Sequence, residues 1–192
     1  IIGWLVSGIL LFLWQEKYLP FHYEYIEQFR LFHYSADYFI EHCSYPSGII
    51  EYLGSFLIQF FNQPHVGAGI VTILLLSVGI GIQQIFKRIA SHVDMPLAYL
   101  LPTLFLLFAG MDINYHLEGT LAFALSVWFL NIQVSFVRPV HRMISGVLLS
   151  WALYYLAGPA FALFALCSVI YEWHKRELSM LYSALLLPIA VL

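Results

Sequence analysis

Apolar residues fall in seven long runs along this chain, and more polar segments separate them. A transmembrane α-helix needs about 20 predominantly apolar residues, with a range of roughly 17–25. The runs that reach or approach this length are candidate membrane spans. Because the sequence opens inside the first run and stops inside the last, we expect it to be a fragment of a longer membrane protein. The candidate spans are residues 1–19, 66–86, 95–110, 117–137, 143–157, 159–173 and a run that begins near residue 178.

One apolar stretch, residues 143–173, is interrupted by Gly158 and Pro159. It is either one long kinked helix or two short ones, because proline breaks or kinks a helix interior. A hairpin puts the flanking cations on one side of the membrane, as the positive-inside rule prefers, whereas a single span separates them. We therefore predict a hairpin that turns at Gly158 and Pro159. The flanking cations are Arg138, Arg142, Lys175 and Arg176.

The hairpin gives a consistent topology, because it places six of the eight lysine and arginine residues on one face. The positive-inside rule assigns this face to the cytoplasm. Eight of the eleven acidic residues fall on the outer face or near its boundary. The cytoplasmic cations are Lys87, Arg88, Arg138, Arg142, Lys175 and Arg176, and the outer acids are Glu16, Glu24, Glu27, Asp37, Glu41, Glu51, Asp112 and Glu118.

Residues 15–65 are predicted to form the first outer loop, because their first half is too polar for a span. Within it, the periodicity predicts one amphipathic helix over residues 22–43, a turn at 45–48 and a second short helix over 49–61. Helices rich in tyrosine and phenylalanine suit the headgroup layer, so we expect both to lie at the membrane surface. The apolar stripe of the first helix consists of Tyr25, Phe29, Phe32, Ala36 and Phe39.

Composition supports the membrane interpretation. Hydrophobic residues make up 61% of the chain and charged residues 10%, and the mean hydropathy is +0.82. An average soluble protein has about 45–50% apolar and about 25% charged residues. A net charge of −3 offers no basic surface for nucleic acid, and the two cysteines form no metal or redox motif. We predict an all-α polytopic transmembrane helix bundle with about seven spans, in which residues 1–192 form a single domain.

The first candidate for chemistry is an acidic stripe on the predicted helix 22–43. Carboxylates grouped at a membrane surface can bind a divalent cation, act as a general base or bind a basic substrate. The same residues also fit a solvated helix face on which Arg30 pairs with its acidic neighbours. The stripe consists of Glu24, Glu27, Arg30, Asp37 and Glu41.

The second candidate lies between the third and fourth predicted spans, where Asp112, His116 and Glu118 occur within seven residues. Two carboxylates and one imidazole can hold Mg²⁺ or Mn²⁺. In the alternative interpretation, Asp112 or Asn114 caps a helix and Glu118 lies in its first turn, where the helix dipole favours a negative charge. Glu118 is the more informative residue, because an ionisable group at membrane depth is costly and often functional.

Residues 22–70 resemble an uncharacterised family of bacterial polytopic membrane proteins. The resemblance rests on a Glu-Gln pair in the first outer loop, a Pro-Gly-Gly-like turn and a Gln-Phe-Phe motif. The turn here has serine at its second position, and the resemblance names no activity. The matching residues are Glu27, Gln28, Leu31, Phe32, Tyr38, Pro46, Ser47, Gly48, Gln59, Phe60, Phe61, Pro64, Gly67 and Ala68.

The predicted architecture also resembles that of the GT-C glycosyltransferases, which transfer sugars from polyprenyl-phosphate carriers at the outer membrane face. The resemblance implies a catalytic carboxylate in the first outer loop, with Glu27 as the best match and Glu16 or Glu24 as alternatives. It implies further acidic help from Asp112 or Glu118. Gln15, Glu16 and Lys17 stand where that family usually carries a paired acidic motif.

The sequence therefore leads to two functional expectations for a multi-pass protein of the bacterial inner membrane. The first is a GT-C-like glycosyltransferase that uses a lipid-linked sugar, with Glu27, Asp112 and Glu118 as catalytic residues. In it, Asp112, His116 and Glu118 are the candidate ligands for Mg²⁺ or Mn²⁺. The second is a non-catalytic membrane subunit or transporter component that binds a partner through its acidic outer face.

Overall fold

The computed structural model describes residues 2–28, 31–89 and 96–175, and every regular element in these ranges is helical. The predicted all-α class is therefore confirmed. The helices are α1 (Ile2–Tyr18), α2 (Pro20–Gln28), α3 (Ala36–Cys43), α4 (Gly48–Ile58), η1 (Gln59–Asn62), α5 (Pro64–Ile89), α6 (Pro96–Ala109), α7 (Leu117–Ser135), α8 (Pro139–Ala157), η2 (Gly158–Ala160) and α9 (Phe161–Lys175).

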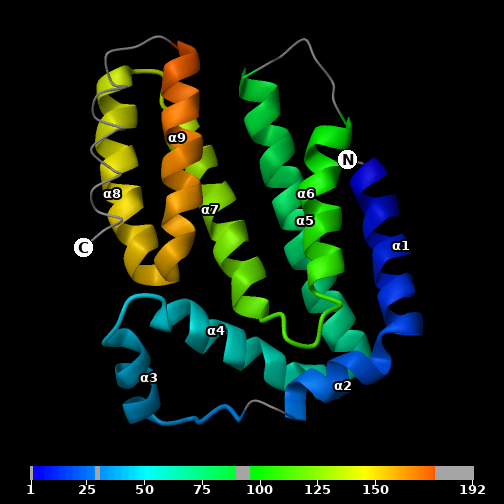
Figure 1. Cartoon of the computed structure of the whole chain (residues 1–192). Helices are drawn as coiled ribbons and strands as arrows, with labels where there is room; N and C mark the ends of the chain where they lie inside the picture. The colour runs from blue at the N-terminus through cyan, green and yellow to red at the C-terminus, as the bar shows by residue number, and fades with distance from the viewer. Residues whose placement is uncertain (1, 29–30, 90–95, 176–192) are drawn as a thin grey trace.

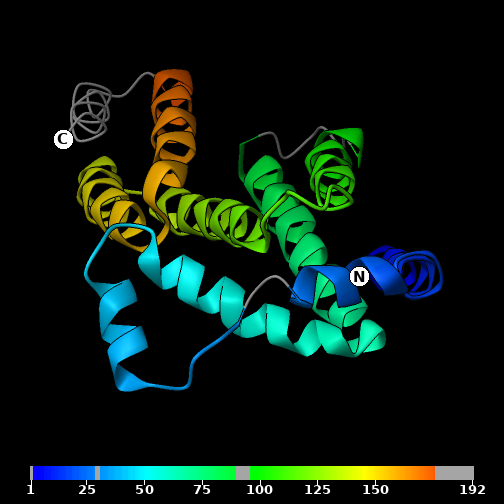
Figure 2. The ribbon, with the colours of Figure 1, turned by 60° about the horizontal axis from the view of Figure 1, so that its bottom comes forward.

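Six longer helices form a bundle, and three shorter ones lie across one of its ends (Figure 1). Helix α5 packs against α1, α6 and α7, and α7 in turn packs against α8 and α9. Helices α2, α3 and α4 run across the lower end of the bundle in Figure 1, and Figure 2 shows them from below. Helix α4 contacts both α7 and α8, so the surface helices are attached to the bundle.

The two ends of the bundle differ in charge, as the predicted topology requires. One end carries the last turn of α5, with Lys87 and Arg88, together with the start of α8 and the end of α9. We name it the basic end. The opposite end, which we name the acidic end, carries α2, α3, α4 and the α6–α7 connection. The assignment of the basic end to the cytoplasm remains a prediction.

Three described stretches are long and apolar enough to cross a membrane, by length and composition: Pro64–Ile89, Leu117–Ser135 and Pro139–Lys175. They support a membrane protein. The predicted number of about seven spans is not confirmed, because these three are the candidates among the described residues; α1, with 17 residues, is at the lower limit of span length and α6, with 14, is below it. The predicted span that begins near residue 178 lies outside the described residues.

The predicted hairpin is confirmed. Helix α8 ends at Ala157, α9 begins at Phe161, and the two helices pack side by side (Figure 1). Gly158 makes the turn with φ of 55° and ψ of −124°. Residues other than glycine rarely adopt this backbone conformation. The turn also docks on the chain before α4, since the Ser47 N–H donates to the Tyr155 carbonyl at 3.1 Å.

The prediction of one continuous helix over residues 22–43 is wrong. Helix α2 ends at Gln28, residues 31–35 are not helical, and α3 begins after Ser35, whose hydroxyl accepts a hydrogen bond from the Tyr38 N–H. The predicted apolar stripe therefore does not exist. The break is explained by Phe32, which packs against Tyr52 and Phe56 of α4 at centroid distances of 4.9 and 5.5 Å. The spacing of apolar residues reports only local structure, so it could not predict this contact with α4.

The second surface helix, predicted over residues 49–61, is confirmed as α4 and η1. Its aromatic residues meet those of α3 and of the preceding segment in one group of edge-to-face and tilted ring contacts. We name this group the loop aromatic cluster. It consists of Phe32, Tyr34, Tyr38, Phe39, His42, Tyr52 and Phe56.

Tyr45 and Ser47 stabilise the start of α4 by hydrogen bonds to the Glu51 carboxylate. The Tyr45 hydroxyl donates to Glu51 Oε2 at 3.0 Å, and the Ser47 hydroxyl donates to Glu51 Oε1 at 2.7 Å. Burial raises the pKa of the Tyr45 phenol to about 12, and the hydrogen bond to Glu51 and its negative charge add to the shift. The neutral phenol is therefore the form that the folded protein favours.

This shift predicts a pH dependence. The pKa of Tyr45 is raised above its ordinary value of 10.0, so its contribution to stability is fully present below pH 10 and is lost as the pH rises through about 12. The difference in ultraviolet phenolate absorbance between the wild type and Tyr45→Phe reports the ionisation of Tyr45, and we expect its midpoint near pH 12. When Glu51→Gln is present in both proteins, this midpoint should move toward pH 10. An unchanged midpoint would show that Glu51 does not influence the phenol.

Candidate functional site

The described residues that were predicted to carry chemistry lie at the acidic end but in different environments, and Arg30 lies outside the described residues. Glu27 is near the end of α2 and is half-buried. Asp112 is exposed in the α6–α7 connection, where its Oδ1 accepts hydrogen bonds from the Asn114 N–H at 3.0 Å and the Asn114 side chain at 3.2 Å. Asp112 therefore has a local turn role, and the predicted helix cap is wrong, because His116 occupies the N-cap position of α7.

Glu118 occupies the first turn of α7, where the positive end of the helix dipole favours a carboxylate. Its side chain is only 7% exposed. Gly54 of α4 makes room for it, since a Cβ at that position would lie 2.6 Å from Glu118 Cγ. Glu118 is therefore buried within the protein, against α4, and its depth in the membrane stays a prediction.

The predicted metal site is not formed by the described residues. Among them, no group of three or more histidine, cysteine, aspartate and glutamate side chains lies close enough to hold a metal ion. Asp112, His116 and Glu118 thus do not converge as a ligand set. His116 is exposed at the N-cap position of α7, while Glu118 is buried. These residues do not fit Mg²⁺ or Mn²⁺.

A cavity of about 280 Å³ lies between α2, α4 and the α6–α7 connection. We name it the surface cavity. Its walls are both apolar and polar, and one predicted site residue, His116, contributes to them. Glu27, Asp112 and Glu118 do not line it, although each is adjacent in sequence to a residue that does. Its lining residues are Tyr25, Ile26, Ile58, Ile113, Asn114, Tyr115, His116 and Leu117.

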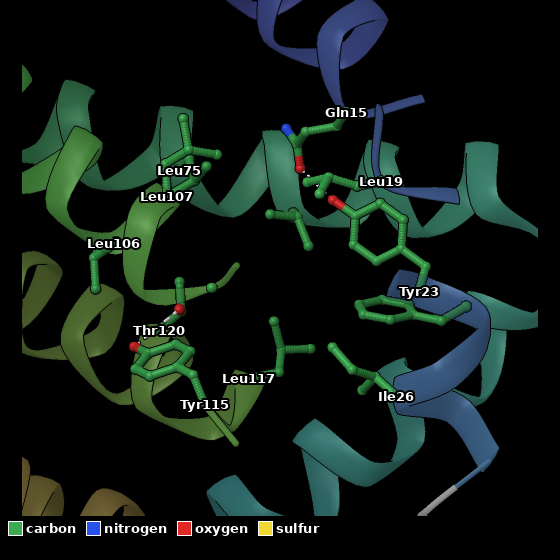
Figure 3. Close-up of a pocket in the computed structure, with 13 residues that line it drawn as sticks. Gln15, Leu19, Tyr23, Ile26, Leu75, Leu106, Leu107, Tyr115, Leu117 and Thr120 are labelled. Atoms are coloured by element: carbon green, nitrogen blue, oxygen red, sulfur yellow. Dashed lines mark hydrogen bonds between the residues drawn. The ribbon is translucent and has the colours of Figure 1, made fainter. Parts of the chain in front are cut away.

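A second cavity of about 40 Å³ lies deeper, between α1, α2, α5, α6 and α7 (Figure 3). We name it the inner cavity. It shares Ile26, Tyr115 and Leu117 with the surface cavity, so the two are neighbours. Its volume is sufficient for two or three water molecules by the usual minimum of about 10–15 Å³ per water.

The inner cavity is bounded on one side by a hydrogen-bonded chain of polar side chains. The Tyr23 hydroxyl donates to Gln15 Oε1, and Gln15 Nε2 donates to Thr72 Oγ1 at 2.9 Å. On the other side, the hydroxyls of Tyr115 and Thr120 are 3.2 Å apart (Figure 3). Burial raises the pKa of the Tyr23 phenol, so this hydroxyl stays protonated and acts as a donor.

Sequence reasoning missed Gln15, Tyr23 and Tyr115. Gln15 is fully buried although it follows the apolar run of α1, and Tyr23 is 3% exposed. The only sequence signal was a polar residue at the end of a predicted span, where water usually reaches it. The bond from Gln15 to Thr72 spans 57 positions, and such a long-range contact leaves no local pattern in the sequence.

The comparison with protein families identifies this chain at family level. A family model described as "Family of unknown function (DUF6057)" matches residues 1–192. The chain belongs to the DUF6057 family. No curated protein and no solved structure matches it. Membership confirms the expectation of an uncharacterised family, so the function of this DUF6057 protein has to be argued from its own residues.

Proposed function

We propose that this chain is the membrane-embedded part of a glycosyltransferase that takes a lipid-linked sugar into the surface cavity. The observation that carries the proposal is the mixed character of that cavity at the end of the apolar bundle. Ile26, Ile58 and Leu117 provide an apolar wall, while Asn114 and His116 provide polar groups. A polyprenyl-phosphate-linked sugar needs both, because its carrier is apolar and its sugar and phosphate are polar.

The proposed reaction is the direct transfer of the sugar to an acceptor hydroxyl. A general base takes the proton of that hydroxyl while its oxygen attacks the anomeric carbon. The bond between the anomeric carbon and the phosphate oxygen breaks, and polyprenyl phosphate leaves. We assign the base to Glu27, because its α2 neighbour Ile26 lines the cavity and its half-buried position leaves it accessible.

The remaining carboxylates take positioning roles in this proposal. Glu118 stands beside the lining residue Leu117 and holds the start of α7 against Gly54. Asp112 shapes the α6–α7 connection through its bonds to Asn114, which lines the cavity. No step is assigned to a metal ion, since these residues do not fit one.

The proposal predicts that Glu27→Gln lowers sugar transfer by about 10²–10⁴-fold, the usual contribution of a general base. The measurement is the release of polyprenyl phosphate from a polyprenyl-phosphoglucose by membranes that contain the full-length protein. Glu24→Gln is the matched control, because Glu24 lies on the same helix and is exposed. Equal activity of the two variants would remove Glu27 from the reaction.

A second candidate function follows from the exposed acids at the same end. Asp37 and Glu41 of α3 and Asp112 are exposed, as a surface for a basic partner requires. In this case the chain is a non-catalytic subunit or transporter component. Charge reversal of Asp37 and Glu41 would then release a co-purifying partner, while Glu27→Gln would change nothing.

A further inference from the structure

An apolar groove of about 320 Å³ lies among α5, α7 and α9, with Pro102 of α6 at one side. It does not share a lining residue with the surface cavity or the inner cavity. Its walls are formed mainly by Ile82, Phe86, Phe123, Leu130, Leu163 and Phe164.

The few polar atoms of the groove do not make it hydrophilic. Ser126 lines it, but its hydroxyl donates to the carbonyls of Ala122 at 2.9 Å and Ala160 at 3.2 Å. Cys167 contributes a thiol, which behaves as a small hydrophobic group. An apolar cavity gives water too few hydrogen-bond partners to hold it. An apolar occupant therefore fits this groove better than water does.

The groove is at membrane depth if the candidate spans cross the bilayer. Helices α5 and α7 are two of the three stretches long and apolar enough to span, and α9 belongs to the third. The apolar molecules available at that depth are lipid acyl chains.

A fixed positive charge stands at one end of the groove. Phe86 lines the groove, and Lys87 and Arg88 follow it in the last turn of α5. The Arg88 guanidinium donates one N–H to the carbonyl of Asn131, directly after the lining residue Leu130 of α7. This bond holds the cation where α5 and α7 meet, while the side chain stays exposed. A guanidinium has five N–H donors and matches the geometry of a phosphate.

We propose that this groove binds one acyl chain of an anionic phospholipid, whose phosphate pairs with Arg88 and Lys87. The last turn of α5, which carries both cations, lies at the basic end of the bundle (Figure 1), whereas the surface cavity is lined by α2, α4 and the α6–α7 connection. The lipid site is independent of the proposed sugar transfer. The lipid ties α5, α7 and α9 together at a position where protein side chains leave a gap.

The charge half of the proposal is tested by native mass spectrometry of the full-length protein in detergent. The probes are equal amounts of dioleoyl phosphatidylglycerol and dioleoyl phosphatidylcholine. We expect a preference for phosphatidylglycerol, with about fivefold supplied by each cation near the headgroup. Arg88→Gln should lower this preference by about fivefold and Arg88→Lys should retain it. Arg138→Gln is the matched control, since Arg138 is an exposed cation at the same end and has no residue of the groove within five positions of it in the sequence. Equal losses in Arg88→Gln and Arg138→Gln would overturn the site in favour of diffuse attraction.

The groove half is tested on the wild type, so that no variant needs to fold. Cys167 lines the groove, whereas Cys43 is the last residue of α3 and does not line it, and both thiols are half-buried and free of disulfides. Adding phosphatidylglycerol should slow the alkylation of Cys167 by N-ethylmaleimide and leave that of Cys43 unchanged. As a second arm, Cys167→Phe should fill the groove and reduce retention of both lipids, while Leu166→Phe on the exposed face of α9 should not. Unchanged alkylation of Cys167 at saturating lipid would overturn the proposal.

Discussion

Arg142→Leu is expected to lower the free energy of unfolding by about 3–5 kcal/mol, the usual cost of breaking a buried ion pair by removing one partner. Arg142 Nε is 2.9 Å from Glu172 Oε1 and Arg142 Nη2 is 3.4 Å from Glu172 Oε2, and the two residues are 3% and 1% exposed. Arg142 Nη1 also donates to the carbonyls of Phe136 and Val137. The substitution therefore leaves a buried carboxylate without its guanidinium and loosens the α7–α8 connection.

The measurement is reversible unfolding in mixed detergent micelles, followed by circular dichroism. Arg138→Leu is the control, because Arg138 is exposed at the N-cap position of α8, four residues before Arg142. The double variant Arg142→Leu/Glu172→Leu should recover most of the loss, since removing both charges also removes their cost of burial. If Arg142→Leu is as stable as Arg138→Leu, the ion pair does not hold α8 and α9 together.

Gly48→Ala is expected to lower the free energy of unfolding by about 3 kcal/mol or more. This is the upper end of the usual effect of adding atoms to a well-packed site. A Cβ on Gly48 would lie 1.8 Å from the carbonyl oxygen of His42, which is backbone of α3 and cannot rotate away. The substitution must therefore push α3 away from the start of α4. Because α3 and α4 pack through the loop aromatic cluster, we expect the near-ultraviolet signal of these aromatic residues to fall.

Gly69→Ala provides the matched control for this prediction. Its added Cβ would meet only Phe12 Cε2, at an ordinary distance of 3.9 Å. Since alanine favours a helix over glycine by up to about 1 kcal/mol, Gly69→Ala should be neutral or stabilising. Equal stability of Gly48→Ala and Gly69→Ala would contradict the contact between α3 and the start of α4.

Helix positions in the bundle followed from local pattern alone. The run predicted over residues 117–137 became α7 (Leu117–Ser135), and the Gly158–Pro159 pair marked the hairpin turn. Both depend on signals within a few residues, namely apolar length and a proline. The helix predicted over 22–43 failed because Phe32 leaves the helical path to contact Tyr52 and Phe56, a tertiary contact that overrides local periodicity.

The candidate site was harder to predict from the sequence, because it too depends on contacts between residues far apart in the chain. The surface cavity brings residues of α2 together with residues of the α6–α7 connection, which are far apart in the sequence. The sequence did not predict the buried bonds among Gln15, Tyr23 and Thr72, which lie up to 57 positions apart. The pairing of Arg142 with Glu172 across 30 positions was likewise absent from any local pattern.

The docking of the hairpin turn on the surface helices has a consequence for biosynthesis. The Tyr155 hydroxyl donates to the Cys43 carbonyl, a bond that joins residues 112 positions apart. A ribosome that has just completed α3 and α4 must still synthesise α5, α6, α7 and α8 before these contacts exist. The contacts between the first loop and Tyr155 therefore form only after α8 has been synthesised. Until then, this part of the first loop lacks its packing partner.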